Sequence, residues 1–161
     1  MSDTDVASWA ALLRVHAALV PLIDRELQAA CGLPLTWYDV LLELNSAPGR
    51  RLSMGELGEA AVVSRTRASR VVDQLAGAGL VTREANPDDR RSAYATITEA
   101  GRATLRAAAP TYLGSIRRHF TSRMTAAEAA AVAAALEKVL DALGRPGARA
   151  PGDETAGRRV R

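Results

Sequence analysis

The sequence is poor in several residue types, and each shortage excludes a class of protein. Cys31 is the only cysteine, which excludes a disulfide within the chain and a cysteine-based metal cluster. Aromatic residues make up only 4% of the 161 residues, whereas 48% are hydrophobic and 24% are charged. This composition is typical of a soluble globular protein and not of a disordered or collagen-like chain.

Long hydrophobic runs are also missing. No uninterrupted apolar run approaches the roughly 18 residues of a membrane span. The opening residues, MSDTDVASWA, lack the basic region and apolar stretch of a secretory signal. We therefore expect a cytoplasmic protein with no membrane partner. The length favours a single domain, which we place at residues 1–144.

The net charge of +3 resides in the C-terminal segment. Residues 145–161 contain five arginines against Asp153 and Glu154, so residues 1–144 sum to zero. Net charge therefore does not by itself point to nucleic acid, and any such inference depends on where the charges lie. The segment is rich in Gly, Pro and Arg and has almost no large apolar residues, which predicts a flexible basic tail.

Apolar spacing predicts long helices on both sides of a central module. We expect helices over residues 6–31, from Thr36 to just before Pro48, over 99–123 and over 125–143. Thr36, with Asp39 three residues on, is expected to cap the second helix. The stripe on the first helix is formed by Trp9, Leu13, His16, Val20, Ile23 and Leu27.

The central module has the element order of a winged helix-turn-helix. Ser53 and Glu56 form a capping box for a short helix, and Ser64 is expected to cap the next one. Alternating residues at 80–85 and 94–98, separated by a polar turn of about seven residues, predict a β-hairpin. The helix that Ser64 is expected to cap is the second helix of this pair. It carries one apolar stripe, formed by Ala68, Val71, Val72 and Leu75. The fold class is thus mainly α with a small β-hairpin wing.

The second helix of such a pair normally enters the major groove of DNA. With the apolar stripe in the core, helical periodicity turns the opposite face outward. We assign base reading to Thr66, Arg67 and Arg70, because Arg fits guanine and Thr offers both a donor and an acceptor. Phosphate positioning is assigned to Ser64, Arg65 and Ser69. The alternative is a solvated helix face in an arginine-rich protein.

The hairpin tip adds a second candidate contact with DNA. Arg90 and Arg91 can reach a narrow minor groove, where negative potential is concentrated. Asp88 or Asp89 could pair with one of them and hold the loop in shape. The alternative here is a solvated turn whose acids and bases cancel.

The motifs of this module resemble a known family. The runs Leu80–Arg83, Pro87–Arg91 and Ile97–Gly101 resemble the wing signature of MarR-type transcriptional regulators. The run Ser64–Leu75 resembles the recognition helix of that family. The resemblance covers roughly residues 6–143 and implies a homodimer that binds a pseudo-palindromic operator and usually represses.

The resemblance also implies roles for single residues and for a ligand. Arg91, supported by Asp89, matches the wing arginine that contacts the minor groove. Members commonly release DNA when a small, often aromatic molecule enters a crevice beside the dimer helices. Here we expect that crevice to be lined by Trp9, Leu13, His16, Val20, Trp37 and Tyr38. For each aromatic, and for His16, the alternative is a core or interface role.

The helices outside the winged module independently favour a dimer. The predicted helices at 6–31, 99–123 and 125–143 carry apolar stripes that one small module cannot cover. Isologous pairing would bury them and set two recognition helices about one DNA turn, ~34 Å, apart. The alternative is that they only complete a monomer core.

No motif indicates an enzyme, a metal site or a cofactor. His16 and His119 are far apart in sequence, so no zinc-ligand cluster is expected. Cys31 lies at a helix C-terminus, where the dipole disfavours a thiolate, so a structural role is favoured over redox sensing. The alternatives to a repressor are a winged-helix module that binds protein and a redox-responsive regulator that uses Cys31.

Overall fold

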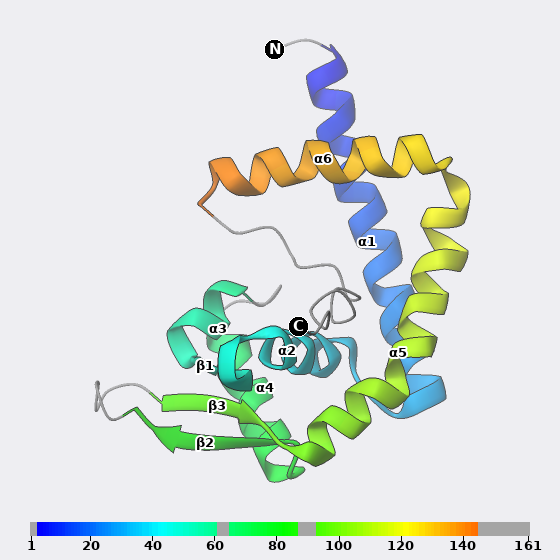
Figure 1. Ribbon diagram of the computed structural model, residues 1–161. Coiled ribbons are helices and arrows are strands. Elements are labelled where there is room, and N and C mark those ends of the chain that lie inside the picture. Colours follow the sequence, from blue (N-terminus) through cyan, green and yellow to red (C-terminus); the bar gives the residue numbers. More distant parts are fainter. Residues whose placement is uncertain (1–2, 61–64, 87–92, 145–161) are drawn as a thin grey trace, which may run out of the picture. The chain divides into compact units, whose positions relative to one another are not determined.

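The computed structural model describes residues 3–60, 65–86 and 93–144. The chain forms two compact units, residues 1–125 and residues 126–161. Among its described residues, the first unit contains five α-helices and a three-stranded sheet (Figure 1). The second contains α6 (Ala126–Ala142), which begins directly after Thr125 as predicted and has no buried residue. The assignment of residues 1–144 to one domain stays a prediction.

Helix α1 (Asp3–Cys31) lies beside α5 (Glu99–His119) in the first unit (Figure 1). Only the C-terminal part of its predicted stripe is buried within the chain, where Ile23 is 8% and Leu27 0% exposed. The helix continues past Pro21 and ends before Gly32, whose φ of +64° is the left-handed conformation that stops a helix. The predicted end of the helix at Cys31 is thus confirmed, whereas the helix begins at Asp3, before the predicted start at residue 6.

The predicted cap of α2 (Leu35–Ser46) is wrong. The residue before the helix is Pro34, which has no side-chain hydrogen bond to the helix end, and Thr36 is already inside it. Instead, the backbone N–H of Leu35 donates to Asp24 Oδ1 at 2.8 Å. A carboxylate on α1 therefore satisfies the free N–H that the sequence pattern assigned to a local hydroxyl.

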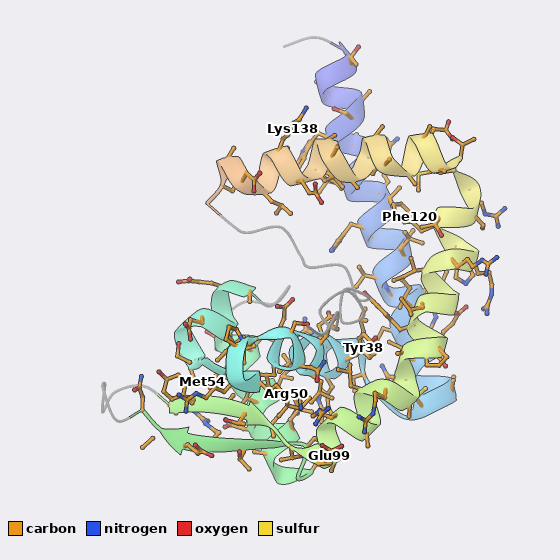
Figure 2. The ribbon with its side chains drawn as sticks, viewed as in Figure 1. Tyr38, Arg50, Met54, Glu99, Phe120 and Lys138 are labelled. Atoms are coloured by element: carbon orange, nitrogen blue, oxygen red, sulfur yellow. The ribbon has the colours of Figure 1, made fainter. Side chains whose placement is uncertain are left out.

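The core of the first unit lies where α2 meets α4, α5 and the sheet. Val40, Leu41 and Leu44 of α2 are fully buried as predicted, whereas Trp37 is half-buried. Tyr38, labelled in Figure 2, is only 1% exposed. The centre of its ring lies 4.3 Å from that of Tyr112 on α5. The buried face of α2 is therefore rotated toward Tyr38 relative to the prediction.

The sheet has one more strand than predicted. Strands β2 (Val81–Ala85) and β3 (Ala93–Ile97) form the expected antiparallel hairpin, in which Val81 pairs with Ile97. Strand β1 (Arg51–Ser53) follows the 3₁₀ turn η1 (Pro48–Arg50) and pairs with the other side of β3. Three residues are too few to show a period-2 pattern, so this pairing was not visible in the sequence.

Helix α5 is shorter than predicted. It ends at His119 instead of at residue 123. The separate 3₁₀ turn η2 (Thr121–Arg123) follows it. Its N-cap is Thr98, whose hydroxyl accepts a hydrogen bond from the N–H of Gly101. The cap places the start of α5 directly after β3.

The segment Val6–Cys31 of α1 is, among the described residues, the one helix long and apolar enough to cross a membrane. This differs from the sequence-based expectation, which counted uninterrupted apolar runs, whereas mean hydropathy averages across residues such as Arg14 and His16. A buried core helix and a signal sequence near the N-terminus pass the same test. By itself the observation is weak evidence for a membrane.

Candidate DNA-binding surface

Helices α3 (Met54–Ala60) and α4 (Arg65–Gly77) form the helix pair of the winged module. The predicted capping box of α3 is confirmed. The N–H of Ser53 donates to Glu56 Oε2 at 2.8 Å, and the N–H of Glu56 donates to Ser53 Oγ at 3.2 Å. The hydrogen bonds from Ser53 hold the pKa of Glu56 below its usual value. The box fixes the start of the helix that precedes α4.

Helix α4 separates an apolar face from a polar one, as predicted. Its apolar stripe is at most 4% exposed and consists of Ala68, Val71, Val72 and Leu75. Thr66, Arg67 and Arg70 are exposed, and Ser69 is half-buried. The three predicted base-reading side chains therefore share the exposed side of one helix.

Several predicted DNA contacts lie outside the described residues. These are Ser64, the side chain of Arg65, and the wing residues Asp89, Arg90 and Arg91. Their roles stay predictions. The strands on either side of the wing tip are described, and they place its base beside the end of α4.

An ion pair joins α4 to the wing. The Arg83 guanidinium on β2 donates to a carboxylate oxygen of Asp73 on α4. On the far side of the sheet, the guanidinium of Arg51 lies 4.7 Å from the centre of the Tyr94 ring. Residue spacing predicts an outward-facing Asp73, but it cannot show a partner on another element.

A second polar contact joins α4 to α2. The indole Nε1 of Trp37 donates to Gln74 Oε1 at 3.3 Å. Gln74 directly follows Asp73, so two successive residues of α4 contact two different elements. Neither Asp73 nor Gln74 was among the predicted site residues.

The turn after α4 is tied to the start of α5. Gly79 has φ +73°, the left-handed end that the sequence predicts for α4. The Thr98 hydroxyl donates to the carbonyl oxygen of Gly79 at 2.8 Å, and the Thr98 N–H donates to that of Leu80 at 3.0 Å. The end of α4, the hairpin and α5 thus meet at one residue.

The six predicted ligand contacts are spread over the chain and do not share one environment. Trp9, Leu13 and Val20 are 60%, 48% and 38% exposed along α1, where His16 is exposed as well. Trp37 is half-buried against α4, and Tyr38 is buried in the core. Their role as a ligand crevice stays a prediction. A shallow groove between α1 and α5 is lined by other residues: Glu26, Ala29, Ala30, Pro110, Thr111, Gly114 and Arg118.

Beside this groove, one carboxylate ties α1 to α5. Glu26 accepts hydrogen bonds from the fully buried Ser115 and from His119, whose Nε2 lies 2.7 Å from Oε1, and it pairs with Arg118 at 3.3 Å. The hydrogen bond from Ser115, and then that from His119, lower the pKa of Glu26. Because Ser115 donates to Glu26 and not to His119, these groups are not arranged as a catalytic triad.

The candidate metal ligands and the cysteine can be located in the part of the chain that the structure describes. That part holds no group of three His, Cys, Asp or Glu residues able to bind a metal ion. Cys31 is exposed at the end of α1, and its Sγ lies 3.6 Å from Thr111 Oγ1.

Comparison with known proteins identifies the family. A family model described as MarR family matches residues 32–92. The crystal structure of AbsC, a MarR family transcriptional regulator from Streptomyces coelicolor, superposes with a TM-score of 0.77 and 31% identity, covering 89% of this chain and 97% of AbsC. The chain belongs to the MarR family of transcriptional regulators. The mainly helical fold with its winged helix-turn-helix, as predicted from the sequence, is that of the family.

Two further relatives of this MarR-family chain bear on its function. Sco3205, a MarR family regulator from Streptomyces coelicolor solved in complex with DNA, is 30% identical with a TM-score of 0.79, covering 89% of this chain and 93% of Sco3205. The transcriptional repressor MprA of Escherichia coli is 33% identical over 81 residues, which are 50% of this chain. The match spans about half the length of the curated relatives, 46% of MprA.

Proposed function

We propose that this MarR-family chain is a homodimeric repressor that binds a pseudo-palindromic operator and is released from it by a small ligand, for which an aromatic molecule is one candidate. The observation that carries the proposal is the exposed face of α4, where Thr66, Arg67 and Arg70 lie opposite a fully packed apolar stripe. The likeness to Sco3205, which was solved with DNA, supports it. The protein would act in the cytoplasm.

The proposed contacts divide into base reading and backbone positioning. Arg67 and Arg70 are long enough to reach base edges in the major groove, and Thr66 can donate or accept there. Ser69, half-buried on the flank, and the N-terminal turn of α4 with Ser64 and Arg65 would contact phosphates. The phosphate contacts fix the register, and the base contacts supply the sequence preference.

The wing would add a minor-groove contact through Arg90 and Arg91, with Asp89 supporting Arg91. The described strands hold the hairpin against α4 through Arg83 and Asp73. A tip that projects from this base could follow the DNA backbone to the next groove. This arrangement supports simultaneous contact by helix and wing.

Dimerisation would use the terminal helices. In the single chain, Trp9 and Leu13 of α1 and Val139 of α6 are 60%, 48% and 55% exposed. A patch of large apolar side chains that are exposed to solvent marks an interaction surface. Isologous pairing through residues 6–31 and 99–143 would cover them and present two recognition helices to the two halves of an operator.

Salt dependence of duplex binding tests the proposal. The duplex is a mixture tiling the region upstream of the protein's own gene, and affinity is measured at several salt concentrations. A DNA reader loses affinity steeply as salt rises, because phosphate contacts release counterions. Arg91→Ala should weaken binding to most sequences, and Arg70→Ala should relax the preference at particular bases. Unchanged binding in both variants would overturn the assigned contacts.

Two other functions would give different results in the same assay. A winged-helix module for protein would show absent or salt-insensitive duplex binding together with specific capture of one protein. A redox regulator would lose peroxide-driven release in Cys31→Ser. Release that persists in Cys31→Ser would exclude that role for the exposed thiol.

A further inference from the structure

Two successive residues of α4 hold this helix from two sides. Asp73 pairs with Arg83 on β2, and Gln74 accepts a hydrogen bond from Trp37 on α2 at 3.3 Å. The two partners lie on elements that are separate in sequence, one in the wing and one next to the core tyrosines. Both contacts fall in the C-terminal half of α4, after the exposed residues Thr66 and Arg70.

We infer that Asp73 and Gln74 are positioning residues, which set the angle of the recognition helix relative to the wing. The inference rests on the proposed DNA binding. The apolar stripe of α4 fixes how deeply the helix sits in the core, but such a stripe tolerates small rolls about the helix axis. Polar contacts on both flanks restrict that roll, because each has a narrow range of favourable geometry.

The exposure of the ion pair indicates a positional role more than a stabilising one. The side chains of Arg83 and Asp73 are 36% and 59% exposed. A pair as accessible as this contributes little to the free energy of folding. Its effect is therefore expected in the geometry of the bound complex, where helix and wing must engage DNA together.

The charge of Asp73 makes this role distinguishable from simple electrostatics. A carboxylate on the exposed face of α4 repels phosphate, so its removal alone should strengthen binding to any duplex. A positioning role predicts the opposite for the preferred sequence, because a misaligned helix loses base contacts. Loss of preference without loss of general affinity is thus the signature of positioning.

The test compares a preferred duplex with a scrambled one. The wild-type protein selects the preferred duplex from a randomised pool, and the scrambled duplex has the same length and composition. In Asp73→Asn the ratio of the two affinities should fall about tenfold, with scrambled affinity unchanged or higher. The charge-swapped double variant Asp73→Arg with Arg83→Asp should recover most of the ratio. Glu84→Gln, the matched control, removes an exposed carboxylate from β2, the strand that carries Arg83, and should leave the ratio unchanged.

The contact with α2 is tested independently through Trp37→Phe, which keeps an aromatic ring and removes the indole donor. Its affinity ratio should fall several-fold, and Gln74→Ala should add nothing further in the double variant. Thermal unfolding of each variant checks that the fold is retained. If Asp73→Asn does not fold, the charge-swapped protein and Trp37→Phe still test the inference.

Three outcomes would overturn the inference. One is an unchanged affinity ratio in both Asp73→Asn and Trp37→Phe. A second is failure of the charge swap together with a salt slope lower by about one in Arg83→Ala, which would make Arg83 a phosphate contact. The third is a wild-type protein that does not distinguish the two duplexes. In that case the proposed sequence-specific DNA binding itself fails. The first two outcomes, in contrast, overturn only the positioning role of Asp73 and Gln74.

Discussion

Gly101 lies so close to the carbonyl oxygen of Leu80 that a Cβ at residue 101 would be 2.2 Å from that oxygen. The same Cβ would be 2.8 Å from Cγ1 of Ile97. The first turn of α5 is thus packed directly on the backbone that leads from α4 into the wing. Thr98 also donates hydrogen bonds to the carbonyl oxygens of Gly79 and Leu80. Together with the packing of Gly101 on Leu80, these hydrogen bonds join α5 to the winged module.

Gly101→Ala should therefore destabilise the protein. The main obstacle is a backbone carbonyl, which cannot turn aside as a flexible side chain can, so we expect a loss of about 2–3 kcal/mol in the free energy of unfolding. Denaturant unfolding measures it. Gly77→Ala is the matched control, because a Cβ there meets nothing within 4 Å. Equal stability of the two variants would contradict the close approach.

Asp39 should make stability fall as pH rises from about 4 to about 6. Burial, and then the nearby Glu43, raise the pKa of Asp39 to about 6. The folded protein therefore keeps this proton over a range in which the unfolded chain, with a pKa near 4, has released it. Because the folded state binds more protons there, raising the pH favours unfolding.

Asp39→Asn should remove this pH dependence. The variant should be more stable at pH 7, by at most about 3 kcal/mol, and its stability should vary less between pH 4 and 6. Urea unfolding at a series of pH values measures both effects. Glu84→Gln, which removes an exposed carboxylate, should keep the wild-type profile. A profile of Asp39→Asn that parallels the wild type would show that another group titrates.

Ser53→Ala should weaken the start of α3 by about 1 kcal/mol, the usual cost of losing an N-cap side chain. The lost contact is the hydrogen bond from the N–H of Glu56 to Ser53 Oγ. Since the pKa of Glu56 is lowered, its return contact is present above its usual pKa and is lost as the pH falls through the lowered value. Thermal unfolding at pH 7 measures the loss, and Ser46→Ala at the exposed end of α2 should be nearly neutral.

Val139→Glu should separate the proposed dimer. Val139 is 55% exposed on the apolar stripe of α6, and a carboxylate there could not be buried at an interface. We expect a monomer in sedimentation equilibrium and an operator affinity about 100-fold lower, because two linked recognition helices bind far more tightly than one. Ala134→Glu adds the same charge to the opposite face of α6 and should remain dimeric. A dimeric Val139→Glu would move the interface elsewhere.

The sequence by itself determined the elements with strong local signals. The stripe of Ala68, Val71, Val72 and Leu75 predicted the buried face of α4, and the Ser53–Glu56 pair predicted the start of α3, because helix periodicity and capping depend only on residues within one or two turns. The wing strands and the left-handed Gly79 were predicted for the same reason. The motifs around these elements were sufficient to identify the family.

Tertiary structure alone decided the contacts between elements that are distant in sequence. Asp24 takes the place of Thr36 at the start of α2, Tyr38 turns into the core against Tyr112, and β1 joins the sheet. The same holds for the pairing of Asp73 with Arg83 and of Gln74 with Trp37. Each of these contacts depends on how two elements pack against each other in space. The positions of the residues along the chain do not specify that packing.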